Sequence, residues 1–129
     1  MRVTMGLAAV ALTACIGEVR PEADTARASY GGIVEARFLA DDLLRVVVEM
    51  EGTRDRRAVL RYAECVATGY AFDRGYAFAR QVRTESAERG GVWRADAVYS
   101  VSTSIPRGLR TIDAEVAVET CRAQGIPTF

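Results

Sequence analysis

Strict alternation of apolar and polar side chains is the strongest pattern in this chain. The clearest case is residues 93–101, where every second residue is apolar: Trp93, Ala95, Ala97, Tyr99 and Val101. Successive side chains of a strand point to opposite faces, so this pattern predicts a strand with one dry and one wet face. Residues 33–40 and 43–50 alternate in the same way on either side of Asp41-Asp42, which predicts a hairpin.

A single stretch follows the helical period instead. Between Ala58 and Tyr70 apolar residues recur three and four positions apart, which predicts an amphipathic helix with Thr53 as its N-cap and an end near Gly75. Further strands are expected at residues 76–84 and 112–119, with a polar loop at 85–91. The order ββαβββ predicts an α+β two-layer sandwich, in which one helix covers one face of a largely antiparallel five-stranded sheet.

The N-terminus resembles an export signal. Arg2 precedes a short apolar stretch, and Leu12-Thr13-Ala14-Cys15 resembles the lipobox of bacterial lipoproteins. The resemblance implies a signal peptide at 1–14 and a lipidated Cys15. The stretch up to residue 30 contains Pro21 and small polar residues without apolar periodicity, which predicts a flexible linker before a single α+β domain at 31–129. The alternative is a secretory signal or a buried N-terminal helix in which Cys15 is incidental.

Lipidation would attach the protein to a membrane without a spanning segment, because two acyl chains are enough for stable anchoring. Ile16 stands where the resemblance would require aspartate for retention in the inner membrane, so we expect the outer membrane, facing the periplasm. The whole chain is loosely similar to small uncharacterised envelope lipoproteins of proteobacteria. The lipobox, the all-arginine set of basic residues and the stretch Leu60–Phe72 carry that similarity.

Two cysteines, Cys65 and Cys121, remain for the domain. An exported protein favours a disulfide between them, and two separate buried thiols are the alternative. Strict alternation along 112–119 would place Cys121 on the wet side of the last strand, which argues against the bridge. A bulge, or a strand that ends near Glu119, would remove this conflict.

Composition excludes several kinds of chemistry. The chain has no histidine, and its 17 basic residues, all arginine, balance 17 carboxylates. Histidine-based catalysis and imidazole metal ligation are therefore excluded, and electrostatics give no argument for a nucleic-acid partner. We expect no catalytic residue, no metal site and no cofactor. Asp41 and Asp42 are neighbouring carboxylates, but side chains in a tight turn point apart into solvent.

The four arginines Arg54, Arg56, Arg57 and Arg61 gather at the start of the predicted helix. Cations near a helix N-terminus oppose the helix dipole, which favours a use for them in contact with an anionic group or a partner. The alternative is a solvated helix start.

Three hypotheses follow for function. The favoured one is a non-catalytic outer-membrane lipoprotein whose domain binds a protein or another envelope component. The second is a lipid- or small-ligand-binding module, which a cavity of several hundred Å³ between helix and sheet would favour. The third, an envelope hydrolase, needs two close, buried carboxylates with raised pKa values.

Lipidation of Cys15 is directly testable, because a chain without lysine that is cut before Cys15 has only one primary amine, its own α-amino group. We expect wild-type protein to incorporate radiolabelled palmitate in cells and the Cys15→Ser variant to incorporate none. N-acylated mature protein should also be inert to amine-reactive dyes. Strong dye labelling would show that the amine-linked acyl chain is missing or that the chain is cut elsewhere.

Overall fold

The computed structural model describes residues 29–108 and 110–129. Its elements in chain order are β1 (Ser29–Ala40), β2 (Leu43–Glu51), α1 (Arg56–Asp73), β3 (Phe78–Arg89), β4 (Val92–Ser102), β5 (Ile112–Asp113) and α2 (Ala114–Ala123). The expected signal peptide, the lipidated Cys15 and the linker up to residue 28 lie outside the described residues. Ser29 and Tyr30, which were expected in the linker, are the first residues of β1.

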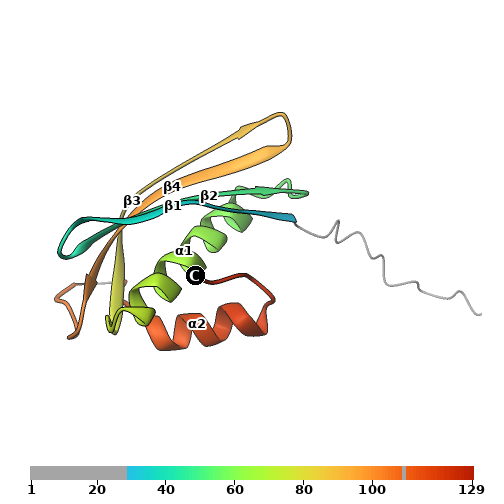
Figure 1. The fold of residues 1–129 in the computed structure, drawn as a ribbon. Coiled ribbons are helices and arrows are strands. Elements are labelled where there is room, and N and C mark those ends of the chain that lie inside the picture. Colours follow the sequence, from blue (N-terminus) through green and yellow to red (C-terminus); the bar gives the residue numbers. More distant parts are fainter. Residues whose placement is uncertain (1–28, 109) are drawn as a thin grey trace, which may run out of the picture.

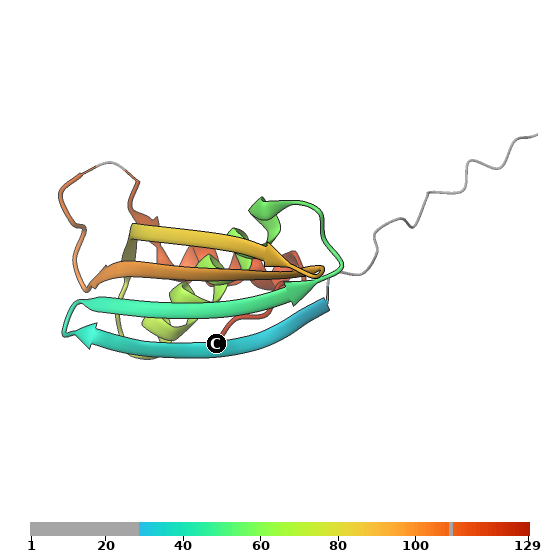
Figure 2. The ribbon, with the colours of Figure 1, turned by 90° about the horizontal axis from the view of Figure 1, so that it is seen from above.

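The five strands form one sheet in the order β1-β2-β4-β3-β5, and every neighbouring pair is antiparallel. Figure 2 shows the four long strands side by side from above. Two tight turns connect the hairpins, at Asp41-Asp42 and at Gly90-Gly91, where both glycines have positive φ. The α+β class and the five-stranded antiparallel sheet predicted from sequence are confirmed.

α1 covers one face of this sheet, and the core lies between them (Figure 1). The apolar sides of β2 and β4 point to the helix, as predicted. On β1, Ala36 and Phe38 pack against the core, but the register shifts between Ile33 and Glu35 and Val34 is 51% exposed. The largest side chains that are fully buried here include Tyr62, Tyr99, Leu44 and Met50. Because α1 connects β2 to β3 while β4 lies between them, the helix contacts all three of these strands.

The opposite face of the sheet carries paired charges. Arg45 lies at their centre, with its Nε donating to Asp96 Oδ1 at 3.0 Å and its Nη1 donating to Glu35 Oε2 at 3.1 Å. The hydrogen bond from Arg45 lowers the pKa of the Asp96 carboxyl below its ordinary value. Val47 and Val98 also point to this face and are nevertheless buried. The wet face predicted from the alternation is therefore a layer of ion pairs.

The predicted strand at 112–119 is wrong beyond Asp113, because the chain continues as helix α2. Asp113 caps this helix, since its Oδ1 accepts from Val116 N at 3.1 Å. Its buried residues are Ala114, Val118 and Cys121, spaced by four and three. Ala114 and Val118 also fit a period of two, whereas Cys121 does not. In a helix, Cys121 lies on the buried side, so the argument against the disulfide that came from strand alternation no longer applies.

Two smaller differences concern element boundaries. The N-cap of α1 is Asp55 and not Thr53, because the Asp55 carboxylate accepts from Arg57 N at 2.8 Å. The prediction of a polar loop at 85–91 is wrong, because β3 continues to Arg89 and pairs with β4 up to that residue. This end of β3 is polar because most of its side chains are exposed to solvent. The end of α1 agrees with the prediction, with Gly75 in the left-handed region.

α2 forms a third layer that the prediction lacked. It packs mainly on α1 and lies on the side of that helix away from the sheet (Figure 1). The disulfide Cys65–Cys121 joins the two helices, with its Cα atoms 5.9 Å apart. Both cysteines are buried. The position of α2 therefore depends on one covalent bond and one helix–helix contact, with β5 at its start.

The disulfide should contribute strongly to stability, because it closes a loop over a sequence separation of 56. In the chain-entropy model such a loop stabilises by about 4 kcal/mol. We expect the Cys65→Ser/Cys121→Ser variant to unfold at much lower urea concentration than oxidised wild type, and reduced wild type to resemble the variant. Peptide mapping without reduction should recover both cysteines in one bridged species. Two freely alkylatable thiols in periplasm-derived protein would contradict this assignment.

Candidate functional site

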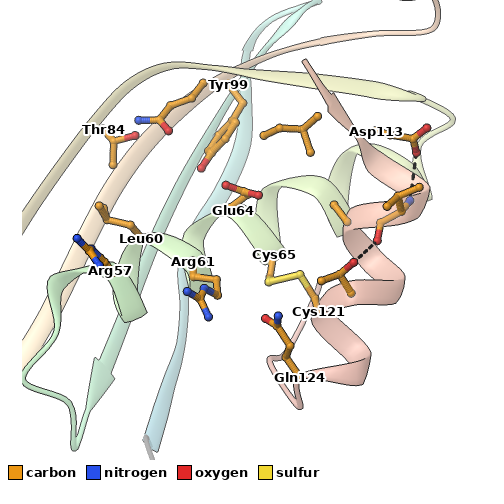
Figure 3. A pocket seen from close by; sticks show the side chains of 15 residues that line it. Arg57, Leu60, Arg61, Glu64, Cys65, Thr84, Tyr99, Asp113, Cys121 and Gln124 are labelled. Carbon is orange, nitrogen blue, oxygen red and sulfur yellow. Dashed lines mark hydrogen bonds between the residues drawn. A yellow bond between two sulfur atoms is a disulfide. The ribbon is translucent and has the colours of Figure 1, made fainter. Parts of the chain in front are cut away.

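A cleft of about 540 Å³ lies between α1, α2 and the sheet. Figure 3 shows the side chains that line it. From α1 come Arg57, Leu60, Arg61, Glu64 and Cys65; from the sheet Gln81, Thr84, Tyr99, Ile112 and Asp113; and from α2 Val116, Ala117, Thr120, Cys121 and the adjacent Gln124. The cleft exists because α2 packs on the helix and leaves the flank of α1 beside β3 open.

Helical spacing brings the α1 residues together. Arg57, Arg61 and Glu64 are four and three positions apart, so they share one side of the helix. The neighbouring stripe, which includes Tyr62 and Val66, is buried in the core. The cleft residues therefore occupy the flank of the apolar stripe, where the helix turns from the sheet toward α2.

A β-bulge aims two residues of β3 into the cleft. The register of β3 on β4 shifts between Gln81 and Arg83, with Val82 as the extra residue. In a regular strand Gln81 and Thr84 would point to opposite faces, because they are three positions apart. The extra residue in the bulge turns Thr84 to the same face of the sheet as Gln81, so both residues line the cleft.

The inner part of the cleft is polar and incompletely satisfied. Glu64 points toward the hydroxyl end of Tyr99, with Thr84 nearby (Figure 3). The Thr84 hydroxyl is buried without a hydrogen-bond partner, and no hydrogen bond among the described residues engages the Glu64 carboxylate. An unsatisfied buried polar group costs roughly 1–3 kcal/mol. These groups can therefore receive hydrogen bonds from, or donate them to, a bound molecule.

Burial shifts the pKa values of Glu64 and Tyr99 in the inner part of the cleft. It raises the pKa of the Glu64 carboxyl above its ordinary value, and the positive charge of Arg61 offsets part of the effect. Burial also raises the pKa of the Tyr99 hydroxyl, and the negative charge of Glu64 adds to this. Tyr99 is 1% exposed. It is consequently a neutral hydroxyl over the whole physiological range.

The predicted arginine cluster divides into two pairs. Arg57 and Arg61 line the cleft, whereas Arg54 and Arg56 do not. All four are exposed. Of the four arginines predicted to contact an anion or a partner, only Arg57 and Arg61, one helical turn apart, can therefore contact a molecule in the cleft.

Other residues considered from sequence lie elsewhere. Asp41 and Asp42 form the exposed turn of the first hairpin and do not line the cleft. In the described part of the chain, no cluster of three or more metal-ligating side chains is found.

No helix within residues 29–108 and 110–129 is long and apolar enough to cross a membrane.

Sequence reasoning missed Glu64, Thr84 and Tyr99 as site residues. Tyr99 was assigned to the core, which is correct for its ring. Glu64 carried a usable signal, because it interrupts the run Tyr62-Ala-Glu-Cys-Val66, in which all the other residues are buried. A carboxylate at such a position has to reach a hollow or a partner.

A second hollow, of about 700 Å³, continues from this cleft along β3. It shares Glu64, Gln81, Thr84 and Ile112 with the cleft and extends toward Arg80 and Arg110. The buried hydroxyl of Thr111, on its wall, also lacks a hydrogen-bond partner. The polar part of the cleft is therefore reached from both sides.

Comparison with known proteins identifies relatives of the domain. The family model of the YNQ4 C-terminal domain matches residues 30–125, almost the whole described region. A Paracoccus denitrificans protein described as "Uncharacterized 26.9 kDa protein in nqo8 5'region" is 29% identical over 100 residues, which are 78% of this chain. The match spans 39% of that relative's length. No solved structure matches the chain.

The raised pKa of Glu64 predicts how stability depends on pH. A carboxyl whose pKa is higher in the folded state favours folding at low pH, and this contribution is lost as pH rises through the folded-state value. We therefore expect Glu64→Gln to raise the melting temperature at pH 7 and to have no effect below about pH 4. Glu51→Gln, at the exposed end of β2, is the control and should change little at either pH. A lower melting temperature for Glu64→Gln at pH 7 would contradict the assignment.

Proposed function

This chain belongs to the YNQ4 C-terminal domain family, and we propose that its domain is a non-catalytic binding module of the cell envelope that takes a small ligand in the cleft between α1, α2 and β3. The cleft is the observation on which the proposal depends. Its volume of about 540 Å³ is in the range of pockets for small organic molecules. Its walls combine apolar side chains with a few converging polar groups, as such pockets do.

The cleft changes the preference among the three hypotheses. A cavity of several hundred Å³ between helix and sheet was the feature expected to favour a small-ligand module. The cleft has such a volume but lies at the flank of α1, between α1, α2 and β3, and not inside the core. Apolar contacts are available from Leu60, Ile112 and the Cys65–Cys121 disulfide, and polar ones from Glu64 and Tyr99. A ligand would thus be held by apolar burial and oriented by a few hydrogen bonds.

Hydrolysis by carboxylates is less well supported. It requires two carboxyl groups acting on one bond. In the cleft, Glu64 is available, but the Asp113 carboxylate accepts the hydrogen bond that caps α2. Binding without chemistry therefore accounts better for the side chains present.

The envelope location is part of the proposal. It is supported by the resemblance of Leu12–Cys15 to a lipobox and by the disulfide, since such bonds persist in oxidising compartments outside the cytosol. A lipid anchor at Cys15 would hold the domain at the periplasmic face of the outer membrane, in contact with molecules of the envelope.

Occupancy of the cleft can be measured with the fluorescent probe 8-anilinonaphthalene-1-sulfonate, an aromatic anion of suitable size. We expect saturable binding of one probe by the oxidised, folded protein. Ala117→Phe, which fills the cleft from α2, should weaken binding by about tenfold, equivalent to ~1.4 kcal/mol.

Ala123→Phe is the matched control, because Ala123 lies exposed on the same helix outside the cleft, and it should bind the probe like wild type. Circular dichroism and melting temperature establish that both variants are folded. Equal probe affinity for the two variants, or no saturable binding to wild type, would refute the proposal.

A further inference from the structure

The side of the cleft formed by the first turns of α1 carries two positive side chains that form no ion pair with another described residue. Arg57 and Arg61 line it, and every ion pair among the described residues lies on the outer sheet face and involves neither of them. The side chain of Asp55, which caps this helix, is engaged by Arg57 N. Two guanidinium groups one turn apart suit an acidic group such as a carboxylate.

The inner side of the same cleft carries the opposite charge. The Glu64 carboxylate is half-buried, and none of the hydrogen bonds within the described residues satisfies it. The hydroxyl of Thr84, which lines the same cleft, is buried and has no partner. A carboxylate in this setting is best satisfied by a hydrogen-bond donor that carries positive charge.

Apolar surface completes the cleft. Leu60 lies on α1 between the two arginines, and Val116 and Ala117 face it from α2. Val116 is 58% exposed, although the Cys65–Cys121 disulfide beside it is buried. A ligand that reaches both charged sides can therefore place an apolar chain against α2.

Arg61 and Glu64 project from neighbouring turns of α1 into the same cleft, with their guanidinium and carboxylate directed to different parts of it (Figure 3). Opposite charges that come from positions three apart on one helix suit a small ligand that carries both an acidic and a basic group. We propose that the cleft binds an amino acid or amino-acid derivative with an apolar side chain, whose carboxylate pairs with Arg61 and Arg57 and whose ammonium group pairs with Glu64. This inference rests on the proposed function and specifies its ligand class.

The chemical class can be tested with compounds that share one ten-carbon chain: 2-aminodecanoic acid, decanoic acid, decylamine and 1-decanol. Each is titrated directly by calorimetry into the full, oxidised protein at physiological salt. We expect 2-aminodecanoic acid to bind about tenfold or more tightly than decanoic acid or decylamine, since it forms one more charge-assisted pair than either of them. 1-Decanol should bind most weakly.

Variants then assign each pair to a side chain. Glu64→Gln should abolish the advantage of 2-aminodecanoic acid over decanoic acid without weakening decanoic acid. Arg57→Gln/Arg61→Gln should weaken both acids about tenfold and leave decylamine no weaker than in wild type. Arg54→Gln/Arg56→Gln is the matched control, because it removes the same charge from the same helix end outside the cleft. It should leave all affinities within about twofold, since salt screens distant charges.

The outcomes separate the two proposals. If anilinonaphthalene sulfonate occupies the cleft but 2-aminodecanoic acid binds no better than decanoic acid, the ligand class is wrong and the binding function stands. The same holds if the control double variant loses as much affinity as Arg57→Gln/Arg61→Gln. If Ala117→Phe affects neither the sulfonate probe nor any ten-carbon compound, the proposed function fails as well.

Discussion

The attachment of α2 to α1 determines the architecture of the candidate site. A sheet with one covering helix buries its apolar face and leaves no further hollow, because side chains of the two layers interdigitate. In this domain a second helix packs on the first, and the Cys65–Cys121 disulfide fixes it there. The space between the free flank of α1, α2 and β3 is then enclosed on three sides. A covalent bond lines the cleft directly, so the wall opposite the sheet can be held in place with little apolar contact.

Much of the sheet could be predicted because its pattern has a single interpretation. Residues 93–101 alternate over nine positions, too long for a coincidental match to a helix, and β4 spans Val92–Ser102. Residues 112–119 alternate over eight positions, but Ala114 and Val118 are also four positions apart and fit a helical spacing. Patterns that fit both periods are ambiguous. The conflict over Cys121 was the available sign that the period of two was the wrong choice, and Asp113 and Gly125 at the two ends of α2 are further helix signals.

The candidate site could be predicted only in part. The arginine cluster is visible in sequence, but which of its members reach the cleft depends on where α2 packs. Gln81 and Thr84 share a face only because of a bulge, and alternation alone would separate them. Tyr99 belongs to the core by its ring, and its hydroxyl end reaches the inner part of the cleft, where Glu64 of α1 points toward it. Sites built at the junction of three elements depend on tertiary packing, for which a single sequence carries no local signal.

Charged side chains are paired on the outer face of the sheet but not in the cleft, and this difference bears on function. On the outer sheet face Arg45 is paired with Glu35 and Asp96, and the layer covers Val47 and Val98. In the cleft Glu64 is half-buried and unpaired, and the Thr84 hydroxyl is unsatisfied. Both arrangements are built from the same residue types, so composition cannot explain the difference. Groups left unsatisfied at the expense of stability are found where a bound molecule satisfies them, which makes the cleft, and not the charged sheet face, the surface to examine for a ligand.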